Sequence, residues 1–236
     1  MYNAAAKVLS GQVFYNSVPT SIHRPKKSRD SVRIVVSTPY GKKTILAKKL
    51  IVAIAPVPEN VVALDLSHNE TSLFARWRSL GYFSGVIEHP GINGTITNSD
   101  PNNPYGFAHL PGIYMLSPNI AGKITFYGGS LFPISTRDAQ QLLSKQINTL
   151  ESGGVISPAE WKLKFITNHS PFRLRADEKD IRCGFYRDLY GLQGKKGTFW
   201  TGAAWAAQDS TLIWQYTEKQ VVPSVIVALE GREGYE

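Results

Sequence analysis

The chain has 236 residues, of which 42% are hydrophobic and 19% are charged, a globular composition that argues against disorder. Its net charge of +8 is carried largely by short lysine pairs at expected turns and strand edges, where lysines keep edges solvated, so we expect no nucleic-acid partner. The longest apolar run, residues 50–57, is far shorter than the roughly 20 residues of a membrane-spanning helix, so we expect no membrane partner either.

The first 57 residues predict the end of a helix followed by strands. Residues 4–9 have a helical composition. The β-prone runs that follow are residues 13–16, 18–24, 32–36, 43–46 and 50–54. Thr38-Pro-Tyr-Gly41 lies between the third and fourth runs and has Pro and Gly where a turn needs them, which predicts a hairpin. The last run is apolar throughout, as in a strand that is buried on both faces of a parallel sheet.

Residues 58–183 predict a second region that mixes helices and strands. The expected strands are residues 82–88, 112–116, 123–127 and 161–167. A helix is expected over residues 71–80, because their apolar side chains recur at helical spacing. A longer helix is expected over residues 135–150, because Ser135 can cap it and its apolar residues form one stripe.

Residues 198–214 carry the most informative pattern. A short β-prone run stops at Gly202, small residues follow, and Asp209 then offers a helix start. Small residues let a bulky ligand approach the backbone, and the unpaired N–H groups of a first helical turn favour negative charge or electron-rich oxygens. A purely structural turn produces the same pattern, so its meaning depends on the rest of the chain.

Several other segments of the C-terminal third supply that context. They are His169-Ser-Pro-Phe172, Gly184-Phe-Tyr-Arg-Asp-Leu-Tyr190, Leu192-Gln-Gly194 and Thr201-Gly-Ala-Ala-Trp205. In order and spacing they resemble the closing segment of fungal flavin-dependent oxidoreductases, amine-oxidase-like enzymes of the β-cyclopiazonate dehydrogenase type. The resemblance spans nearly all of residues 1–222. It implies an α/β (α+β) fold with a partial Rossmann-type FAD domain, a β-meander and a mixed-sheet substrate domain.

The same resemblance implies domain boundaries and a non-covalent FAD. Residues 1–57 would form part of the FAD domain, residues 58–183 the substrate domain, and residues 184–236 the return to the FAD domain with a flavin-facing helix. The residues assigned to the cofactor are Val18, Gly202, Ala203, Ser210, Thr211, Leu212 and Ile213. Pro19 has no N–H and falls where the adenine contact is expected, so either Val18 serves or one hydrogen bond is lost. Cys183 does not align with a flavin attachment site.

The flavin accepts the hydride in such enzymes, so few protein groups are needed for the chemistry. The catalytic candidates are His169, Tyr186 and Trp205, and the expected pocket walls are Phe172, Phe185, Tyr186 and Leu212. Each also has a structural interpretation, as a backbone-bonded histidine or as core packing. Leu212 stands where amine oxidases carry an aromatic residue of the substrate cage, which favours a bulky, apolar substrate over a simple amine. The histidines lack metal-ligand spacing, so we expect no metal.

The G-x-G-x-x-G loop that holds the pyrophosphate in the family does not occur in this sequence. We therefore expect the C-terminal portion of an FAD-dependent oxidoreductase that abstracts a hydride from a C–H or C–N bond of a secondary-metabolite-like molecule. The alternative is a non-catalytic, truncated remnant or partner-binding scaffold that binds no flavin. The expected partners are a small-molecule substrate and either a separate N-terminal half or a second copy. As written, the chain predicts a cytoplasmic protein, although a full-length relative could be secretory.

Overall fold

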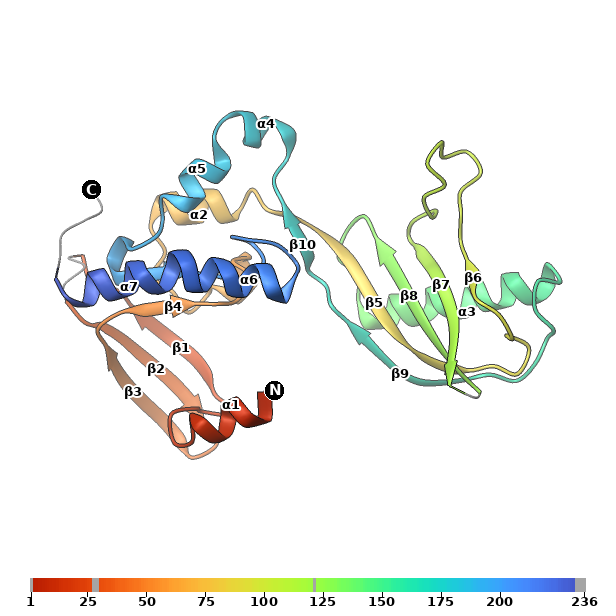
Figure 1. Ribbon diagram of the computed structural model, residues 1–236, viewed down its shortest axis with the longest axis horizontal. Coiled ribbons are helices and arrows are strands. Elements are labelled where there is room, and N and C mark those ends of the chain that lie inside the picture. Colours follow the sequence, from red (N-terminus) through yellow and green to blue (C-terminus); the bar gives the residue numbers. More distant parts are fainter. Residues whose placement is uncertain (1, 27–29, 121, 232–236) are drawn as a thin grey trace. The chain divides into compact units, whose positions relative to one another are not determined.

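The computed structural model describes residues 2–26, 30–120 and 122–231, and the chain forms two compact units. Unit 1 combines Met1–Trp77 with Ala176–Glu236, and unit 2 is Arg78–Arg175. Both units mix helices with strands (Figure 1), which confirms the predicted α+β class. Unit 2 lies within the range 58–183 that the resemblance assigns to a substrate domain. Among the described residues, no helix has the length and apolar character that a membrane crossing requires.

Unit 1 contains two small sheets. The strands are β1 (Val18–His23), β2 (Val32–Thr38), β3 (Gly41–Ala47), β4 (Leu50–Val52) and β11 (Thr198–Trp200). The first three form an antiparallel sheet in the order β1-β2-β3. Thr38 faces Gly41 at the end of the β2–β3 hairpin, so the predicted hairpin is confirmed. In the second sheet, β4 pairs in parallel with β11, which joins the two chain segments of unit 1.

The helices of unit 1 surround these sheets. They are α1 (Tyr2–Val8), η1 (Pro58–Asn60), α2 (His68–Phe74), α4 (Glu178–Arg182), α5 (Phe185–Tyr190), η2 (Lys195–Gly197), α6 (Ser210–Tyr216) and α7 (Val222–Leu229). A π-helical segment, η3 (Thr217–Val221), joins α6 to α7, so that the two helices form one continuous rod in Figure 1. The predicted helix start at Asp209 is confirmed.

A buried ion cluster ties β1 to α2 in unit 1. The Arg24 side chain is fully buried, and its Nε donates to Asp65 at 2.7 Å. Its Nη1 and Nη2 donate to the two carboxylate oxygens of Glu70 at 2.6 and 2.8 Å. Ser67 caps α2 and donates its hydroxyl hydrogen to Glu70 at 2.8 Å. Every charge in the cluster therefore has a partner, as a buried charge requires.

Unit 2 is a sheet with a helix, α3 (Thr136–Ser152), along one face (Figure 1). Its strands are β5 (Arg78–Glu88), β6 (Ile96–Thr97), β7 (Gly112–Ile120), β8 (Lys123–Ser130), β9 (Lys162–Asn168) and β10 (Phe172–Arg175). The strand order is β10-β5-β8-β7-β6, with β9 paired to β5. The core of the unit is formed by Phe83, Ile87, Ile92, Ile113, Leu116, Ile124, Phe126, Ala139, Leu143, Ile147 and Ile156. All these residues come from unit 2 itself.

The long helix of unit 2 confirms the prediction made from its stripe and cap. The Ser135 hydroxyl oxygen accepts a hydrogen bond from the Asp138 amide, and the Asp138 carboxylate accepts one from the Ser135 amide. This reciprocal capping box satisfies two groups that would otherwise lack partners. Ala139, Leu143 and Ile147 are buried against the sheet.

Three predictions about elements of unit 1 and the start of unit 2 were wrong in part. Residues 13–16 form a loop with a turn at residues 15 and 16 rather than a strand. The helix expected over residues 71–80 begins at His68 and ends at Phe74, because the following residues pair as β5 with β8, β9 and β10. In the run at residues 50–54, only Leu50–Val52 forms a parallel strand, and Ile51 and Ile54 are exposed. The faces of a parallel sheet are buried by helices that pack over both sides, and the sheet of β4 has only β11 as a second strand among the described residues, so it offers little area for such packing.

Candidate functional site

The strand β11 leads into a tight turn at Gly202. The Thr201 amide donates to the Val52 carbonyl at 3.0 Å, which extends the ladder with β4. Gly202 has a φ of +103°, and its carbonyl accepts from the amides of Trp205 at 3.1 Å and Ala206 at 3.2 Å. A Cβ at Gly202 would meet Ala53 only at 3.6 Å, so the backbone conformation, rather than space, requires glycine here. Ala203 follows in the turn and is half-buried.

The start of α6 leaves two of its amide groups open. Asp209 is the N-cap, and its carboxylate accepts from the Leu212 amide at 2.9 Å. The Ile213 amide donates to the Asp209 carbonyl at 3.0 Å. The amides of Ser210 and Thr211 have no acceptor among the described residues, as expected for a first helical turn. Their side chains are exposed, and that of Leu212 is 49% exposed.

These residues fit a flavin. The turn at Gly202 presents small side chains, and the open amides of Ser210 and Thr211 can donate to an electron-rich ring oxygen. The Asp209 carboxylate already occupies part of the positive helix end, so a second negative group is stabilised less there than at an uncapped helix. A neutral or weakly charged acceptor suits this arrangement best.

The backbone around Val18 lies at a sheet edge. Val18 faces Ser37 and Pro19 faces Val36 in the ladder with β2. On its other edge, the pairing of β1 within the described residues is the bridge from Ile22 to Leu64. Val18 is 64% exposed. The strand edge at Val18 is therefore accessible to the edge of a planar base.

Three of the aromatic candidates lie in unit 1, and two of them belong to its core. Trp205 is 1% exposed and stacks on Trp200, with ring centroids 5.3 Å apart and planes at 10°. Phe185 is fully buried and meets Trp77 edge-on at 4.8 Å. Tyr186 packs against Phe185 at 5.3 Å but is only half-buried. For Trp205 and Phe185 this geometry favours the packing interpretation, and Tyr186 keeps an accessible side.

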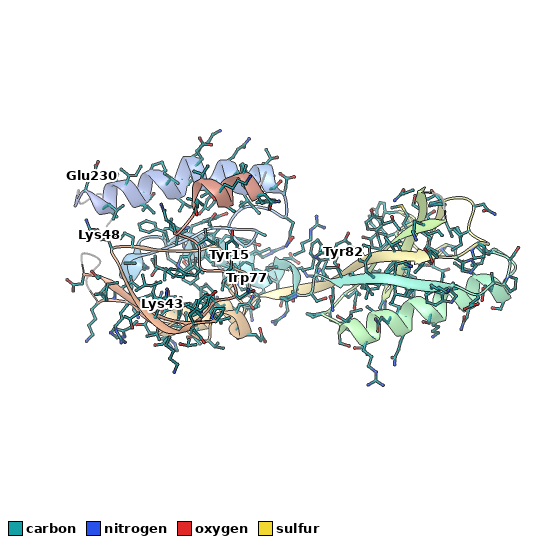
Figure 2. All side chains as sticks on the ribbon, turned by 90° about the horizontal axis from the view of Figure 1, so that it is seen from below. Tyr15, Lys43, Lys48, Trp77, Tyr82 and Glu230 are labelled. Atoms are coloured by element: carbon teal, nitrogen blue, oxygen red, sulfur yellow. The ribbon has the colours of Figure 1, made fainter. Side chains whose placement is uncertain are left out.

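The remaining candidates lie in unit 2, where a tyrosine that the sequence analysis missed brings them together. The ring of Tyr82 in β5 (Figure 2) packs against those of His169 and Phe172, with ring centroids 5.2 Å and 4.7 Å apart. The His169 amide donates to the Tyr82 carbonyl at 2.8 Å, while the imidazole side of the residue is exposed. His169 is thus backbone-bonded and also accessible to a ligand.

Two further tyrosines extend this group. Tyr114 of β7 and Tyr127 of β8 stack with centroids 6.5 Å apart. Burial raises the pKa of Tyr114 to about 12, helped by the charge and hydrogen bond of Tyr82 and by the charge of Tyr127. In β5, half-buried Tyr82 and Ser84 alternate with buried Phe83, so Tyr82 lies on the sheet face opposite the core of unit 2. This alternation was the signal that could have identified Tyr82.

The fold agrees with comparisons to known proteins. No protein-family model matches the chain. Among curated proteins, the FAD-dependent oxidoreductase oblC of Cochliobolus heterostrophus is 34% identical to this chain over 97% of the chain's length. The beta-cyclopiazonate dehydrogenase of Aspergillus flavus is 33% identical to this chain over 93% of the chain's length. The chain spans 50% and 48% of these two proteins, that is, about half the length of the curated relatives it matches.

Solved structures show the same fold at lower identity. The crystal structure of the CLA-producing fatty acid isomerase from P. acnes matches with a TM-score of 0.66 and 18% identity, covering 88% of this chain and 47% of that one. Cyclohexylamine oxidase from Brevibacterium oxydans matches with a TM-score of 0.51 and 12% identity, covering 92% and 49%. Over the half of their length that it spans, the chain is therefore similar to fungal FAD-dependent oxidoreductases, among them beta-cyclopiazonate dehydrogenase.

Proposed function

We propose that this chain forms part of an FAD-dependent oxidoreductase that abstracts a hydride from a C–H or C–N bond of a bulky small molecule. The observation that carries the proposal is the turn at Gly202 followed by the open amides of Ser210 and Thr211, in a chain whose relatives are named FAD-dependent oxidoreductases. When bound, FAD supplies the acceptor for the hydride.

Each residue on the cofactor side has a proposed role. Gly202 and Ala203 let the phosphate and ribityl part of FAD approach the backbone. The amides of Ser210 and Thr211 donate to the electron-rich edge of the ring, while Leu212 and Ile213 hold the helix start in place through Asp209. The backbone edge at Val18 pairs with the adenine. The FAD is held without a covalent bond.

On the substrate side of the proposal, each unit offers contacts of its own. In unit 2, Phe172 offers partly accessible aromatic surface. In unit 1, Tyr186 offers partly accessible aromatic surface and Phe185 supports it from the core. Leu212, also in unit 1, exposes an aliphatic side chain, which suits a bulky apolar molecule. The exposed His169 orients the substrate through a hydrogen bond. Trp205 supports the turn at Gly202 and does not contact the substrate, because it is buried.

The experiment is a titration of the purified chain with FAD, followed by visible absorbance and flavin fluorescence. The second arm adds the separately expressed N-terminal half of the Aspergillus flavus relative, which supplies the part of the protein that this chain does not match. We expect weak FAD binding by the chain alone and tighter binding in the mixture. The proposal is contradicted if the two halves form a complex whose spectrum does not change on adding FAD.

A non-catalytic, partner-binding protein is the second candidate. The observation that favours it is the exposure of Ile51, at 45%, in the two-stranded β4–β11 sheet and of Ile54, at 49%, in the bend that follows β4. Exposed apolar strands of this kind promote association. The partner would be a separately encoded N-terminal half or a second copy of the chain. A complex that forms without any FAD binding distinguishes this candidate from the first.

A further inference from the structure

The unit 2 sheet has a face that is turned away from its hydrophobic core. From Leu80 onward in β5, buried residues alternate with half-buried ones, and Tyr82 belongs to the half-buried set. By the same alternation, Arg78 lies on the face away from the core. Residues that face each other across neighbouring strands share one side of a sheet. Phe172 of β10 faces Leu80, and Arg175 of β10 faces Arg78. This end of the face therefore combines aromatic rings with two arginines.

A bulge in β10 brings Phe172 and Arg175 to the same side of the sheet. The two residues are three positions apart, and successive side chains of a regular strand point to opposite faces, so a regular strand would place them on opposite sides. In β10 the register shifts between them, and two residues of β10 lie opposite Ser79 alone in β5. The one extra residue therefore turns Arg175 onto the face that carries the Phe172 ring.

The bulge strains the backbone at Arg173. This residue has a φ of +53°, in the left-handed region that residues other than glycine seldom adopt. The bulge also sets Arg175 directly opposite Arg78, and like charges in directly opposite positions repel each other. Strained backbone of this kind is concentrated at ligand-binding sites. An anion bound beside Arg175 offsets the repulsion, because it neutralises positive charge at that position.

The charge of Arg175 is not balanced within the part of the chain that the structure describes. Arg175 is exposed and forms no hydrogen bond or ion pair with another described residue. Residues 161–175, which include β9 and β10, contain no Asp or Glu. The acidic residue of β5 is Glu88, at the other end of the strand, where it pairs with Lys123 and, at 3.5 Å, with Lys164. A negatively charged ligand therefore meets no competing carboxylate of unit 2 at Arg175.

The aromatic rings beside Arg175 offer a surface for a flat molecule. The rings of Phe172 and Tyr82 have centroids 4.7 Å apart and planes at 31°, and the His169 ring lies against Tyr82 at 27°. Phe172 and Tyr82 are half-buried, so each keeps an accessible part. The register positions of Phe172 and Arg175 are two residues of β5 apart, about 7 Å along the strand. One ligand can therefore stack on Phe172 and reach Arg175 with an acidic group at its edge.

We propose that unit 2 binds a flat aromatic acid, with its ring on Phe172 and Tyr82 and its carboxylate on the guanidinium of Arg175. A guanidinium presents parallel N–H groups that match the two oxygens of a carboxylate, so Arg175 fixes the orientation of the ligand as well as its charge. This inference rests on the proposed function, because it names the substrate class of the same oxidoreductase: a bulky molecule whose aromatic body carries an acidic group.

The test compares two flat probes of nearly the same shape, 2-naphthoate and 2-naphthamide, of which only 2-naphthoate is charged at neutral pH. Each probe is titrated with the full chain without FAD, and binding is followed by NMR of the probe. We expect 2-naphthoate to bind about fivefold more tightly than 2-naphthamide, the effect of one well-formed ion pair at an exposed site. The difference should shrink at high salt, because salt screens an exposed pair.

The variants separate the ion pair from ring stacking. Arg175→Gln should bind both probes as weakly as the unmodified chain binds 2-naphthamide, because the rings remain and the cation is lost. Arg137→Gln is the matched control and should keep the preference for 2-naphthoate, because Arg137 is an exposed arginine of α3, on the other side of the sheet. Phe172→Leu should weaken the binding of both probes alike. Equal binding of the two probes by the unmodified chain, or a preference that survives in Arg175→Gln, overturns the proposal. Since no FAD is present, a chain that fails to bind flavin can still pass this test.

Discussion

At the scale of single residues, Asp209 decides which amides at the start of α6 remain for a ligand. Its side chain accepts a hydrogen bond from the Leu212 amide and its carbonyl accepts one from the Ile213 amide. Of the first four amides, those of Ser210 and Thr211 therefore remain without an acceptor among the described residues. Sequence reasoning identified the helix start from residue types but could not tell which of its four amides the cap would use. That depends on the rotamer of Asp209, which composition does not determine.

Replacement of Ser210 by proline tests the role of this helix start. Proline is tolerated at the first helical position and removes the amide donor there. Asp209 has an extended conformation, with φ of −138° and ψ of 127°, which a following proline accepts. We expect Ser210→Pro to weaken FAD binding by about fivefold or more in the flavin titration, the loss of one hydrogen bond to a polar acceptor.

The control for this variant is Ser210→Ala, which removes the hydroxyl and keeps the amide. It should bind FAD as tightly as the unmodified chain. Circular dichroism and the melting temperature should show that α6 survives in both variants. Equal FAD affinity of the proline and alanine variants would show that the Ser210 amide does not contact the cofactor.

Arg24 is the residue on which the stability of the β1–α2 contact depends most. We expect Arg24→Met to lower the free energy of unfolding by about 3–5 kcal/mol, because it leaves the Glu70 carboxylate buried without its main partner. Chemical denaturation measures this change. The matched control, Arg182→Met, breaks a pair with Glu178 in which both side chains are 78% exposed, and it should cost less than about 1 kcal/mol.

The pH dependence of the Arg24 effect follows from Glu70. Burial alone raises the pKa of Glu70, but the hydrogen bonds from Arg24 and Ser67 and the charge of Arg24 bring it below its ordinary value of 4.5. The stabilisation is therefore present above that value and lost as the pH falls through the lowered pKa. In Arg24→Met the deficit should be largest at neutral pH and shrink in acid, where Glu70 takes up a proton. A deficit that is independent of pH would contradict this account.

At the scale of elements, local signals predicted what local interactions determine. The β2–β3 hairpin follows from its Pro-Gly turn, and α3 follows from its Ser135 cap and apolar stripe. The helix expected over residues 71–80 was wrong beyond Phe74, because Trp77 and Leu80 continue a helical spacing while Leu80 pairs with Phe172, a partner far along the chain. Long-range pairing of this kind overrides local periodicity.

The β4–β11 sheet makes a testable prediction at this scale. Ile51 is exposed in this short parallel sheet and Ile54 in the bend that follows β4, so we expect the chain to self-associate when it is alone. Changing both residues to lysine should shift the chain toward the monomer, as measured by gel filtration with light scattering. Tyr40→Lys is the control, because Tyr40 is 94% exposed at the tip of the β2–β3 hairpin. A monomeric unmodified chain would refute the prediction.

At the scale of the whole molecule, the sequence predicted the strand–turn–helix around Gly202 but not the group of aromatic side chains in unit 2. Gly202 and Asp209 lie close together in the chain, so their strand–turn–helix context could be read locally. Tyr82 and Tyr114 come together only through the strand order β5-β8-β7, which no local pattern contains. The sequence therefore offered His169 and Phe172 as candidates without the residue that joins them.

The division into two units predicts how the chain tolerates dissection. Every residue of the unit 2 core lies within Arg78–Arg175, so this fragment contains a complete hydrophobic core. We expect it to fold alone with a cooperative thermal transition. In contrast, the fragment Met1–Trp77 should remain largely unfolded, because two of its contacts are made with the other segment of unit 1. The strand β4 pairs with β11, and the ring centroids of Phe74 and Trp200 are 5.2 Å apart.

Leu143→Ala within the unit 2 fragment should lower its free energy of unfolding by about 2–5 kcal/mol, whereas exposed Gln141→Ala should not. A fragment of unit 2 that melts without cooperativity would mean that its core depends on the rest of the chain.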